Sequence, residues 1–393
     1  MKAIVQTGIR RLELAQRPEP AISRADEVLF KVEAVGVCGS DIHYYRSGQI
    51  GDKVVEYPFP LGHECAGTVV AVGAAVVHLQ PGDRIAIDPA VSCGACDQCS
   101  GGRPHTCRRL LFLGCPGELD GCLSEYYVLP ASCCFKVDPH TSLERAALVE
   151  PLSIGCYAVQ LAQLKPGMKV GILGLGPIGF AVLVAARAQD LDWFGVSDPL
   201  RYRRQLALAQ GARVACDPHA RDPVQALGDA LDVVFECCGQ QSALGDACRL
   251  LTPGGKLVVI GIPEAEQVVF DPHLLRRAEI AIQSVRRQNG CMQMAIDLVE
   301  NPDLDLDFMH THTFALEATS AAFELVDGYR DQVVKAVAAQ QPDHVFEEGA
   351  VADGDHRLRH PVGFRTWQHV GTILLSERRL RYGCRRCLGE RCG

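Results

Sequence analysis

Two hydrophobic patterns divide the chain. Residues 27–37 and 66–88 are rich in Val, Ile and Ala and contain Gly-Asp and Pro-Gly pairs, which predicts short strands joined by turns in a β-rich unit. After about residue 150, helix-like runs alternate with short apolar runs, the pattern of βαβ units that build a parallel sheet. The predicted helices cover 151–164, 177–189, 200–210 and 242–251, and the predicted strands cover 169–173, 193–197, 231–235 and 256–260.

One uncharged stretch, residues 170–186, approaches the length of a membrane span, which needs at least about 17 residues. It contains four glycines and a proline, and its two halves differ in kind. We therefore predict a strand, a tight turn and a buried helix here, and no membrane segment.

Size and charge narrow the expected partners. A chain of 393 residues and 42.6 kDa has room for two or three domains. The net charge of -8 provides no basic surface for nucleic acid and no attraction to an anionic membrane, so a small molecule is the expected partner. The N-terminus lacks the apolar segment of a signal peptide, which predicts a cytoplasmic protein.

A glycine-rich motif occupies the turn between the first predicted strand and helix of the parallel-sheet region. The motif reads Gly174-Leu175-Gly176-Pro177-Ile178-Gly179. In such a motif the first glycine permits the tight turn, the second lets the backbone approach a pyrophosphate, and the third lets the helix pack on the strand. The helix N-terminus supplies amide donors for the pyrophosphate, so we predict a dinucleotide site.

An acidic residue at the end of the next predicted strand indicates which dinucleotide binds. Asp198 lies 19 residues beyond Gly179, where it can accept hydrogen bonds from the adenosine ribose and would repel a 2′-phosphate. This arrangement favours NAD over NADP. Arg201 and Arg203 follow closely and leave NADP as an alternative.

Four of the nineteen cysteines form a compact cluster, Cys93, Cys96, Cys99 and Cys107, with the spacing C-x2-C-x2-C-x7-C. Four thiolates suit tetrahedral zinc and leave no position for a substrate, so the predicted site is structural. An iron-sulfur cluster and plain thiols are the alternatives, but the bacterial cluster pattern has a shorter last interval followed by proline.

A second group of metal-ligand residues is spread over the first 150 positions. Cys38, His63 and Glu64 offer a thiolate, an imidazole and a carboxylate, and Glu150 adds a further carboxylate before the first predicted helix. Each residue alone is more often structural than ligating. Beside a dinucleotide site, however, this set has the composition of a catalytic zinc site with an open position.

With these motifs the chain resembles the zinc-dependent medium-chain dehydrogenase/reductase family, in particular its sorbitol (polyol) dehydrogenase-like branch. The resemblance covers about residues 1–341 and rests on C-G-S-D-x-H, G-H-E, the cysteine lobe, E-P-L-S and the glycine motif, in the family order. It implies an α/β protein with a GroES-like catalytic domain (1–150), a Rossmann NAD-binding domain (151–286) and a return segment (287–341). It also implies a homodimer or homotetramer.

The resemblance assigns roles to individual residues. Cys38 and His63 match catalytic zinc ligands, and Glu64 and Glu150 are both candidate carboxylates because members differ in which one binds. Ser40 and His43 match a proton relay through the nicotinamide ribose. The alternatives are that Ser40 forms a hydrogen bond with the backbone and that His43 is a surface histidine. Asp41 is expected to support a ligand or the local structure. Tyr44 and Arg286 fall at substrate-contact positions, with ordinary packing and salt bridging as the alternatives.

The expected function is oxidation of a secondary alcohol of a polyol or sugar acid, with zinc and NAD as cofactors. An L-threonine-type hydroxy amino acid dehydrogenase and a non-catalytic nucleotide-binding protein on the same fold are the alternatives.

Residues 342–393 depart from the family pattern, which normally ends near the strand expected at 332–337. This arginine-rich tail contains Cys384, Cys387 and Cys392. We expect a disordered or adventitious extension, with a second metal knuckle or a tether to RNA or an acidic partner as alternatives.

Overall fold

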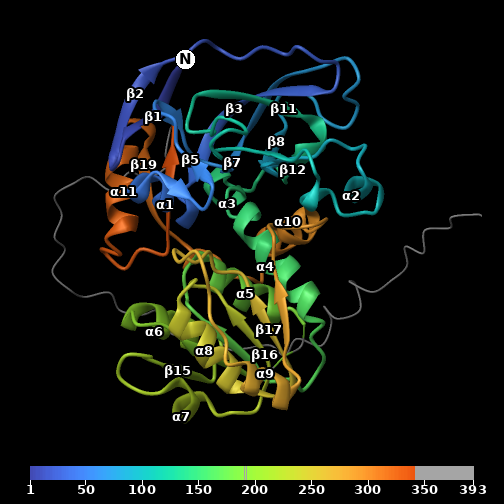
Figure 1. Cartoon of the computed structure of the whole chain (residues 1–393). Coiled ribbons are helices and arrows are strands. Elements are labelled where there is room, and N and C mark those ends of the chain that lie inside the picture. Colours follow the sequence, from blue (N-terminus) through green and yellow to red (C-terminus); the bar gives the residue numbers. More distant parts are fainter. Residues whose placement is uncertain (190, 192, 341–393) are drawn as a thin grey trace, which may run out of the picture.

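The computed structural model describes residues 1–189, 191 and 193–340, which form two sheet-centred parts (Figure 1). The blue N-terminal elements share the upper part with the red C-terminal elements α11 (Thr319–Asp327) and β19 (His310–Ala315), while the green-to-yellow elements form the lower part. Two segments far apart in the sequence therefore build one unit. The predicted tail lies outside the described residues.

The lower part is a doubly wound parallel sheet. Its six strands follow the order β15-β14-β13-β16-β17-β18, and all neighbours are parallel. Numbered from β13, this order is 3-2-1-4-5-6, the arrangement of a Rossmann fold. The strands are β13 (Val170–Leu173), β14 (Phe194–Ser197), β15 (Val214–Cys216), β16 (Leu231–Glu236), β17 (Leu251–Val259) and β18 (Ala281–Ser284).

Helices flank this sheet, and four of them were predicted. They are α4 (Val149–Ala162), α5 (Pro177–Arg187), α6 (Arg201–Ala209) and α8 (Gln241–Leu250), joined by the shorter α7 (Pro223–Leu227) and α9 (Pro272–Ala278). The uncharged stretch is the strand β13, a turn and α5, as expected. β13 is fully buried, and α5 is buried over most of its length. Among the described residues, no helix combines the length and apolar character that crossing a membrane requires.

The upper part is built on a mostly antiparallel sheet. Its path is β12-β8-β7-β3-β20-β19, with β11 also paired to β3, and a smaller sheet β2-β1-β6 lies beside it. The long strand β3 (Glu27–Gly36) alternates half-buried and buried residues, as a strand covered on one face does. The remaining strands are β1 (Lys2–Gly8), β2 (Arg11–Gln16), β6 (Phe59–Pro60), β7 (Glu64–Val72), β8 (Arg84–Ile87), β11 (Tyr126–Pro130), β12 (Cys134–Lys136) and β20 (Lys335–Ala339).

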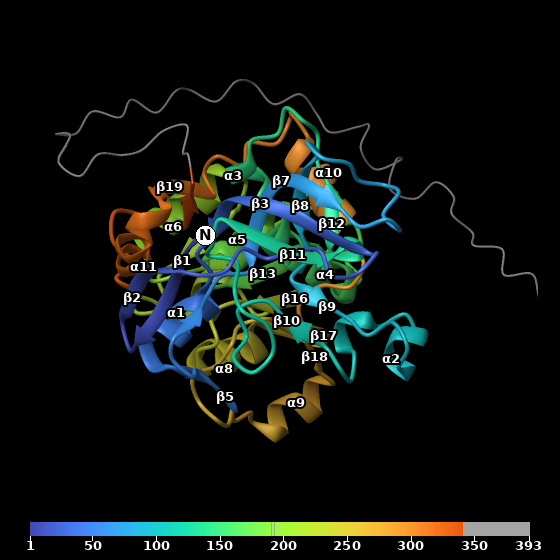
Figure 2. The ribbon, with the colours of Figure 1, turned by 90° about the horizontal axis from the view of Figure 1, so that it is seen from above.

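Short elements complete the molecule. α10 (Met292–Glu300) packs against α4 where the chain returns to the upper part. Figure 2 shows α2 projecting from the rim of the molecule. The other elements are α1 (Gly39–Ser47), α2 (Asp97–Ser100), α3 (Leu143–Ala146), β4 (Gln49–Ile50), β5 (Lys53–Val54), β9 (Ala90–Val91), β10 (Leu111–Phe112) and the 3-10 turns 104–106, 131–133 and 316–318.

The last strand begins later than the sequence suggests. The expected strand at 332–337 is β20, which starts at Lys335. Asp331 and Gln332 have φ angles of 48° and 56°, so the left-handed backbone delays the extended conformation.

Candidate active site

The end of β3 and the start of β7 bring three candidate metal ligands together. Gly36 pairs with Glu64 across these strands, and α1 begins directly after Cys38. Ligand atoms of Cys38, His63 and Glu64 all lie within 4.8 Å of one another. One thiolate, one imidazole and one carboxylate suit zinc while leaving a position open, so the donor set fits a catalytic zinc ion.

Asp41 supports two of these residues from behind. One carboxylate oxygen accepts a hydrogen bond from the backbone N–H of Cys38 at 3.0 Å, and the other lies 3.4 Å from Nδ1 of His63. Only 1% of Asp41 is exposed. A carboxylate behind a ligating histidine orients the ring, which is the supporting role expected from the sequence.

A buried lysine, which the sequence analysis missed, contacts the candidate ligand Glu64. The ammonium of Lys335 lies 2.7 Å from Oε1 of Glu64 and also donates to the backbone oxygen of Val37 at 3.1 Å. Lysine is almost never fully buried unless it is paired. The only signal in the sequence was a lysine at the start of an apolar strand.

Glu150, at the start of α4, is not among the residues whose ligand atoms meet. Its side chain is buried, and its Oε2 has no hydrogen-bond partner among the described residues. Burial raises the pKa of Glu150 to about 8, with Glu64 adding to the shift and His63 opposing it. Glu64 is therefore the carboxylate that lies close to Cys38 and His63, and Glu150 is a second buried carboxylate outside this group.

The two candidate relay residues lie on α1 at different depths. Ser40 donates from its hydroxyl to the sulfur of Cys38 at 3.3 Å. His43 lines a cavity of about 200 Å³ between α1 and the loop after β17, and its Nδ1 lies 3.9 Å from Oε1 of Glu264. Burial lowers the pKa of His43, Glu264 opposes this shift and Arg46 adds to it. One candidate thus touches a metal ligand, and the other reaches a cavity.

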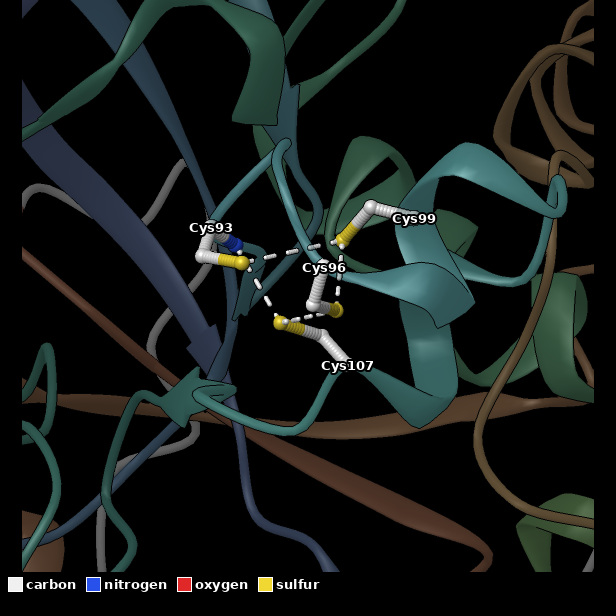
Figure 3. A group of neighbouring side chains, drawn as sticks. All are labelled: Cys93, Cys96, Cys99 and Cys107. Carbon is white, nitrogen blue, oxygen red and sulfur yellow. Dashed lines mark hydrogen bonds between the residues drawn. The ribbon is translucent and has the colours of Figure 1, made fainter.

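The four cysteines of the second group surround a common centre in Figure 3. The sulfur atoms of Cys96 and Cys99 are 3.6 Å apart, those of Cys96 and Cys107 are 3.8 Å apart, and those of Cys93 and Cys99 are 4.0 Å apart. Four sulfurs at about 2.3 Å from one tetrahedral zinc ion would be separated by about 3.8 Å. The cluster therefore fits structural zinc without rearrangement.

The glycine motif forms the turn between β13 and α5. Gly174 has a φ of 89°, and a Cβ there would lie 2.8 Å from Cβ of Cys238. At Gly179 a Cβ would lie 2.0 Å from the backbone oxygen of Gly174. At Gly176 a Cβ would have only Nη1 of Arg203 within 4 Å, at 3.9 Å, and Pro177 and Ile178 start the helix. A pyrophosphate therefore has room beside Gly176 at the N-terminus of α5.

Asp198 and Arg203 lie next to this turn. Asp198 accepts hydrogen bonds from the N–H groups of Leu175 and Leu200, both at 2.8 Å. Arg203 donates to the backbone oxygen of Val333 at 3.2 Å, and its Nη1 would lie 3.9 Å from a Cβ at position 176. Nη1 of Arg203 also lies 3.9 Å from Oδ2 of Asp198, so an acid and a base lie side by side next to the glycine turn.

Family comparisons match both parts of the molecule. Residues 24–139 match the alcohol dehydrogenase GroES-like domain, and residues 177–301 match the zinc-binding dehydrogenase family. The sorbitol dehydrogenase of Bacillus subtilis is 34% identical over 342 residues, which cover 86% of this chain and 96% of that protein. The chain belongs to the zinc-binding alcohol dehydrogenases. It lies in the sorbitol dehydrogenase-like branch that the sequence motifs predicted.

Two solved structures bear on the cofactor of this zinc-binding alcohol dehydrogenase. A Sinorhizobium meliloti structure titled as a zinc-binding dehydrogenase contains NADP, with a TM-score of 0.77, 31% identity and coverage of 86% of this chain and 98% of that chain. An Escherichia coli alcohol dehydrogenase contains NADH, with a TM-score of 0.78, 28% identity and coverage of 86% and 99%. Since both dinucleotides occur among these similar structures, the choice rests on this chain's own residues.

In this dehydrogenase the two predicted substrate contacts lie in different environments. Tyr44 is buried, and its hydroxyl lies 3.9 Å from the sulfur of Cys115; burial raises its pKa far above the ordinary range. Arg286 is exposed, whereas the guanidinium of Arg287 stacks on the ring of Phe112 at 3.6 Å. The sequence could not separate the two adjacent arginines.

Phe112 connects Arg287 with the metal ligands of the dehydrogenase. Its ring centroid lies 5.2 Å from that of His63. Arg287 is therefore one aromatic ring away from a candidate zinc ligand, and its Nη1 is buried without a hydrogen-bond partner among the described residues. Sequence reasoning missed both Arg287 and Lys335.

Proposed function

We propose that the protein is a zinc- and NAD-dependent dehydrogenase that oxidises a secondary alcohol of a polyol or sugar acid. The observation that carries this proposal is the group formed by Cys38, His63 and Glu64, whose ligand atoms lie within 4.8 Å of one another. Three protein ligands of this kind leave a position for a substrate oxygen.

The chain's own residues hold and orient the reacting groups. Cys38, His63 and Glu64 would hold the zinc ion, with Glu150 as the second carboxylate. When bound, zinc acts as a Lewis acid that lowers the pKa of an alcohol, and NAD accepts a hydride. Glu150 is buried and has an oxygen without a hydrogen-bond partner among the described residues, which supports its part in exchanging ligands or water.

Two residues of α1 move the proton that alcohol oxidation releases. Ser40, beside the sulfur of Cys38, would accept the proton from the substrate hydroxyl while it releases its own hydroxyl proton towards His43. His43 borders the cavity and passes a proton to solvent; its lowered pKa keeps the imidazole neutral and ready to accept.

NAD is the expected dinucleotide. Gly174, Gly176 and Gly179 leave the turn open for a pyrophosphate, and Arg203 lies beside it. The buried carboxylate of Asp198 would repel a 2′-phosphate, which supports NAD rather than NADP.

Several relatives suggest the substrate class. Sorbitol dehydrogenases of Bacillus subtilis and of cattle are 34% and 36% identical to this chain. The guanidinium of Arg287 lies on Phe112, whose ring is close to that of His63, and we assign the polar substrate contact to Arg287 rather than to the exposed Arg286. Tyr44 stays a proposed substrate contact.

We also infer a homo-oligomer in the cytoplasm. β18 is an edge strand of the parallel sheet, and Ile282 on it is 41% exposed. An exposed apolar edge supports pairing with a second copy, either as a dimer or within a tetramer. All cysteines among the described residues are free thiols, which supports a reducing compartment.

Metal analysis combined with a substrate panel tests the proposal. The panel contains polyols, sugar acids and L-threonine, and NADH formation is followed by absorbance. Cys38→Ala should lower zinc from about two ions to about one per chain and abolish NADH formation. Cys248→Ala, at a buried cysteine on α8 away from the metal groups, serves as the matched control. No turnover of any panel compound, with zinc unaffected by Cys38→Ala, would refute the proposal.

A further inference from the structure

The loop after β10 directs an acidic side chain into the molecule. Gly114 and Gly117 have left-handed φ angles of 66° and 76°, and the N–H of Glu118 donates to the backbone oxygen of Cys115 at 3.0 Å. The turn leaves only 13% of the Glu118 side chain exposed. A charged side chain is rarely this buried unless it has a partner.

Glu118 has one paired oxygen and one unpaired oxygen. Oε1 lies 3.0 Å from the ammonium of Lys53. Oε2 is buried and has no hydrogen-bond partner among the described residues. Since buried polar atoms nearly always find a partner, Oε2 marks the position of a donor that this part of the chain does not supply.

Arg287 presents the complementary group. Its Nη1 is a buried donor without a partner among the described residues, and its guanidinium rests on Phe112. Burial lowers the pKa of Arg287 to about 10, with Arg286 adding to the shift and the charge of Glu118 opposing it. No ion pair joins Glu118 and Arg287 within the described part of the chain, so each retains a free polar atom.

Contacts through neighbouring residues link Glu118 and Arg287 to the candidate active site. Phe112, under the guanidinium, has its ring centroid 5.2 Å from that of His63. Cys115, whose backbone holds Glu118, has its sulfur 3.9 Å from the Tyr44 hydroxyl. The donor is therefore one aromatic ring away from a metal ligand, and the acceptor lies on the loop that contacts Tyr44, a predicted substrate residue.

The acceptor of Glu118 and the donor of Arg287 together favour some substrates of the proposed dehydrogenase over others. A hydroxyl group both donates and accepts hydrogen bonds, so neighbouring hydroxyls of one polyol can satisfy Glu118 and Arg287 together. A carboxylate or phosphate only accepts; it would satisfy Arg287 but leave Glu118 without a donor and face its like charge. We propose that Glu118 is a specificity-determining residue that makes neutral polyols the preferred substrates over sugar acids and phosphorylated polyols. This inference rests on the proposed dehydrogenase function.

Paired neutral and anionic substrates test the inference in the zinc-loaded enzyme with NAD. The values of kcat/KM are measured for D-sorbitol, D-gluconate and D-sorbitol 6-phosphate. Wild-type protein should have its highest kcat/KM for sorbitol. Glu118→Gln should lower the ratio of kcat/KM for sorbitol to kcat/KM for each anion by roughly ten-fold or more. Asp120→Asn is the matched control because it removes an exposed charge, paired with Arg17, from the same loop. It should leave the ratio within about two-fold.

A second variant keeps the test decisive if Glu118→Gln is unstable. Lys53→Gln removes the cation beside Glu118 and leaves its negative charge less compensated, so the ratio should move in the opposite direction, further against anions. A wild-type preference for gluconate or the phosphate, or an unchanged ratio in both variants, overturns the role of Glu118. Absence of any activity in wild-type protein would instead refute the dehydrogenase proposal itself.

Discussion

Lys335 and Glu64 form a buried ion pair in which the ammonium lies 2.7 Å from Oε1, and the side chains are each 1% exposed. The partners are 271 residues apart in sequence and come from β20 and β7. The pair ties the returning C-terminal segment to a candidate zinc ligand.

Removal of the lysine should destabilise the protein. Lys335→Met leaves the carboxylate of Glu64 buried without its cation, and breaking one partner of a buried pair costs about 3–5 kcal/mol. The loss should be smaller with zinc, because the metal supplies positive charge to Glu64. Denaturant unfolding of metal-free and zinc-loaded protein measures both values. Lys335→Arg, which keeps the charge, should retain more stability; equal losses in both variants would argue against an electrostatic role.

The cysteine lobe should stabilise the fold and take no part in the reaction. Cys96→Ser removes the sulfur that lies 3.6 Å from that of Cys99 and 3.8 Å from that of Cys107, so zinc content should fall by about one ion per chain. The melting temperature should drop, while Cys38→Ala should leave it closer to wild type. Elemental analysis and thermal unfolding check this contrast. Full zinc content in Cys96→Ser would exclude the lobe as a metal site.

His43 should control the acid side of the pH profile. Its pKa is lowered by burial, so the imidazole remains neutral and able to accept a proton below the ordinary value of about 6.5. Glu264→Gln removes the carboxylate that raises this pKa and should shift the acid limb of kcat/KM to still lower pH. His43→Asn should slow oxidation by roughly 100-fold near neutral pH. An acid limb that does not respond to either change would remove His43 from the relay.

Asp198 should select NAD. In Asp198→Asn the repulsive charge is lost, while the amide oxygen can still accept one of the two backbone N–H groups. The ratio of kcat/KM for NAD over NADP should fall by roughly ten-fold, which corresponds to about 1.4 kcal/mol. Steady-state kinetics with both dinucleotides measure the ratio. Selectivity equal to that of wild type would mean that another residue discriminates.

The adjacent arginines provide a matched pair of variants. Arg287→Ala removes a guanidinium stacked on Phe112 beside the metal ligands and should lower kcat/KM for a polyol by roughly 10- to 100-fold. Arg286→Ala alters an exposed side chain and should stay within about two-fold of wild type. The reverse order of effects would restore Arg286 as the contact.

The parallel-sheet region could be predicted because its signals are local. Strand β13, the glycine turn and α5 follow one another without interruption, and a Cβ at Gly179 would meet the backbone oxygen of Gly174 within the same turn. The expected strand at 332–337 was displaced because left-handed residues at 331 and 332 are not recognisable from apolar periodicity.

The sequence by itself determined the family, the order of the motifs, the cysteine spacing and the acid that follows the glycine motif. Only the tertiary structure decided that Lys335 faces Glu64, that Arg287 rather than Arg286 lies on Phe112, and that Glu118 retains an unpaired oxygen. The physical reason is that motifs encode interactions within one turn or loop. Long-range partners depend on strand register and on single backbone angles, such as the φ of 55° at Arg287, which no local pattern reports.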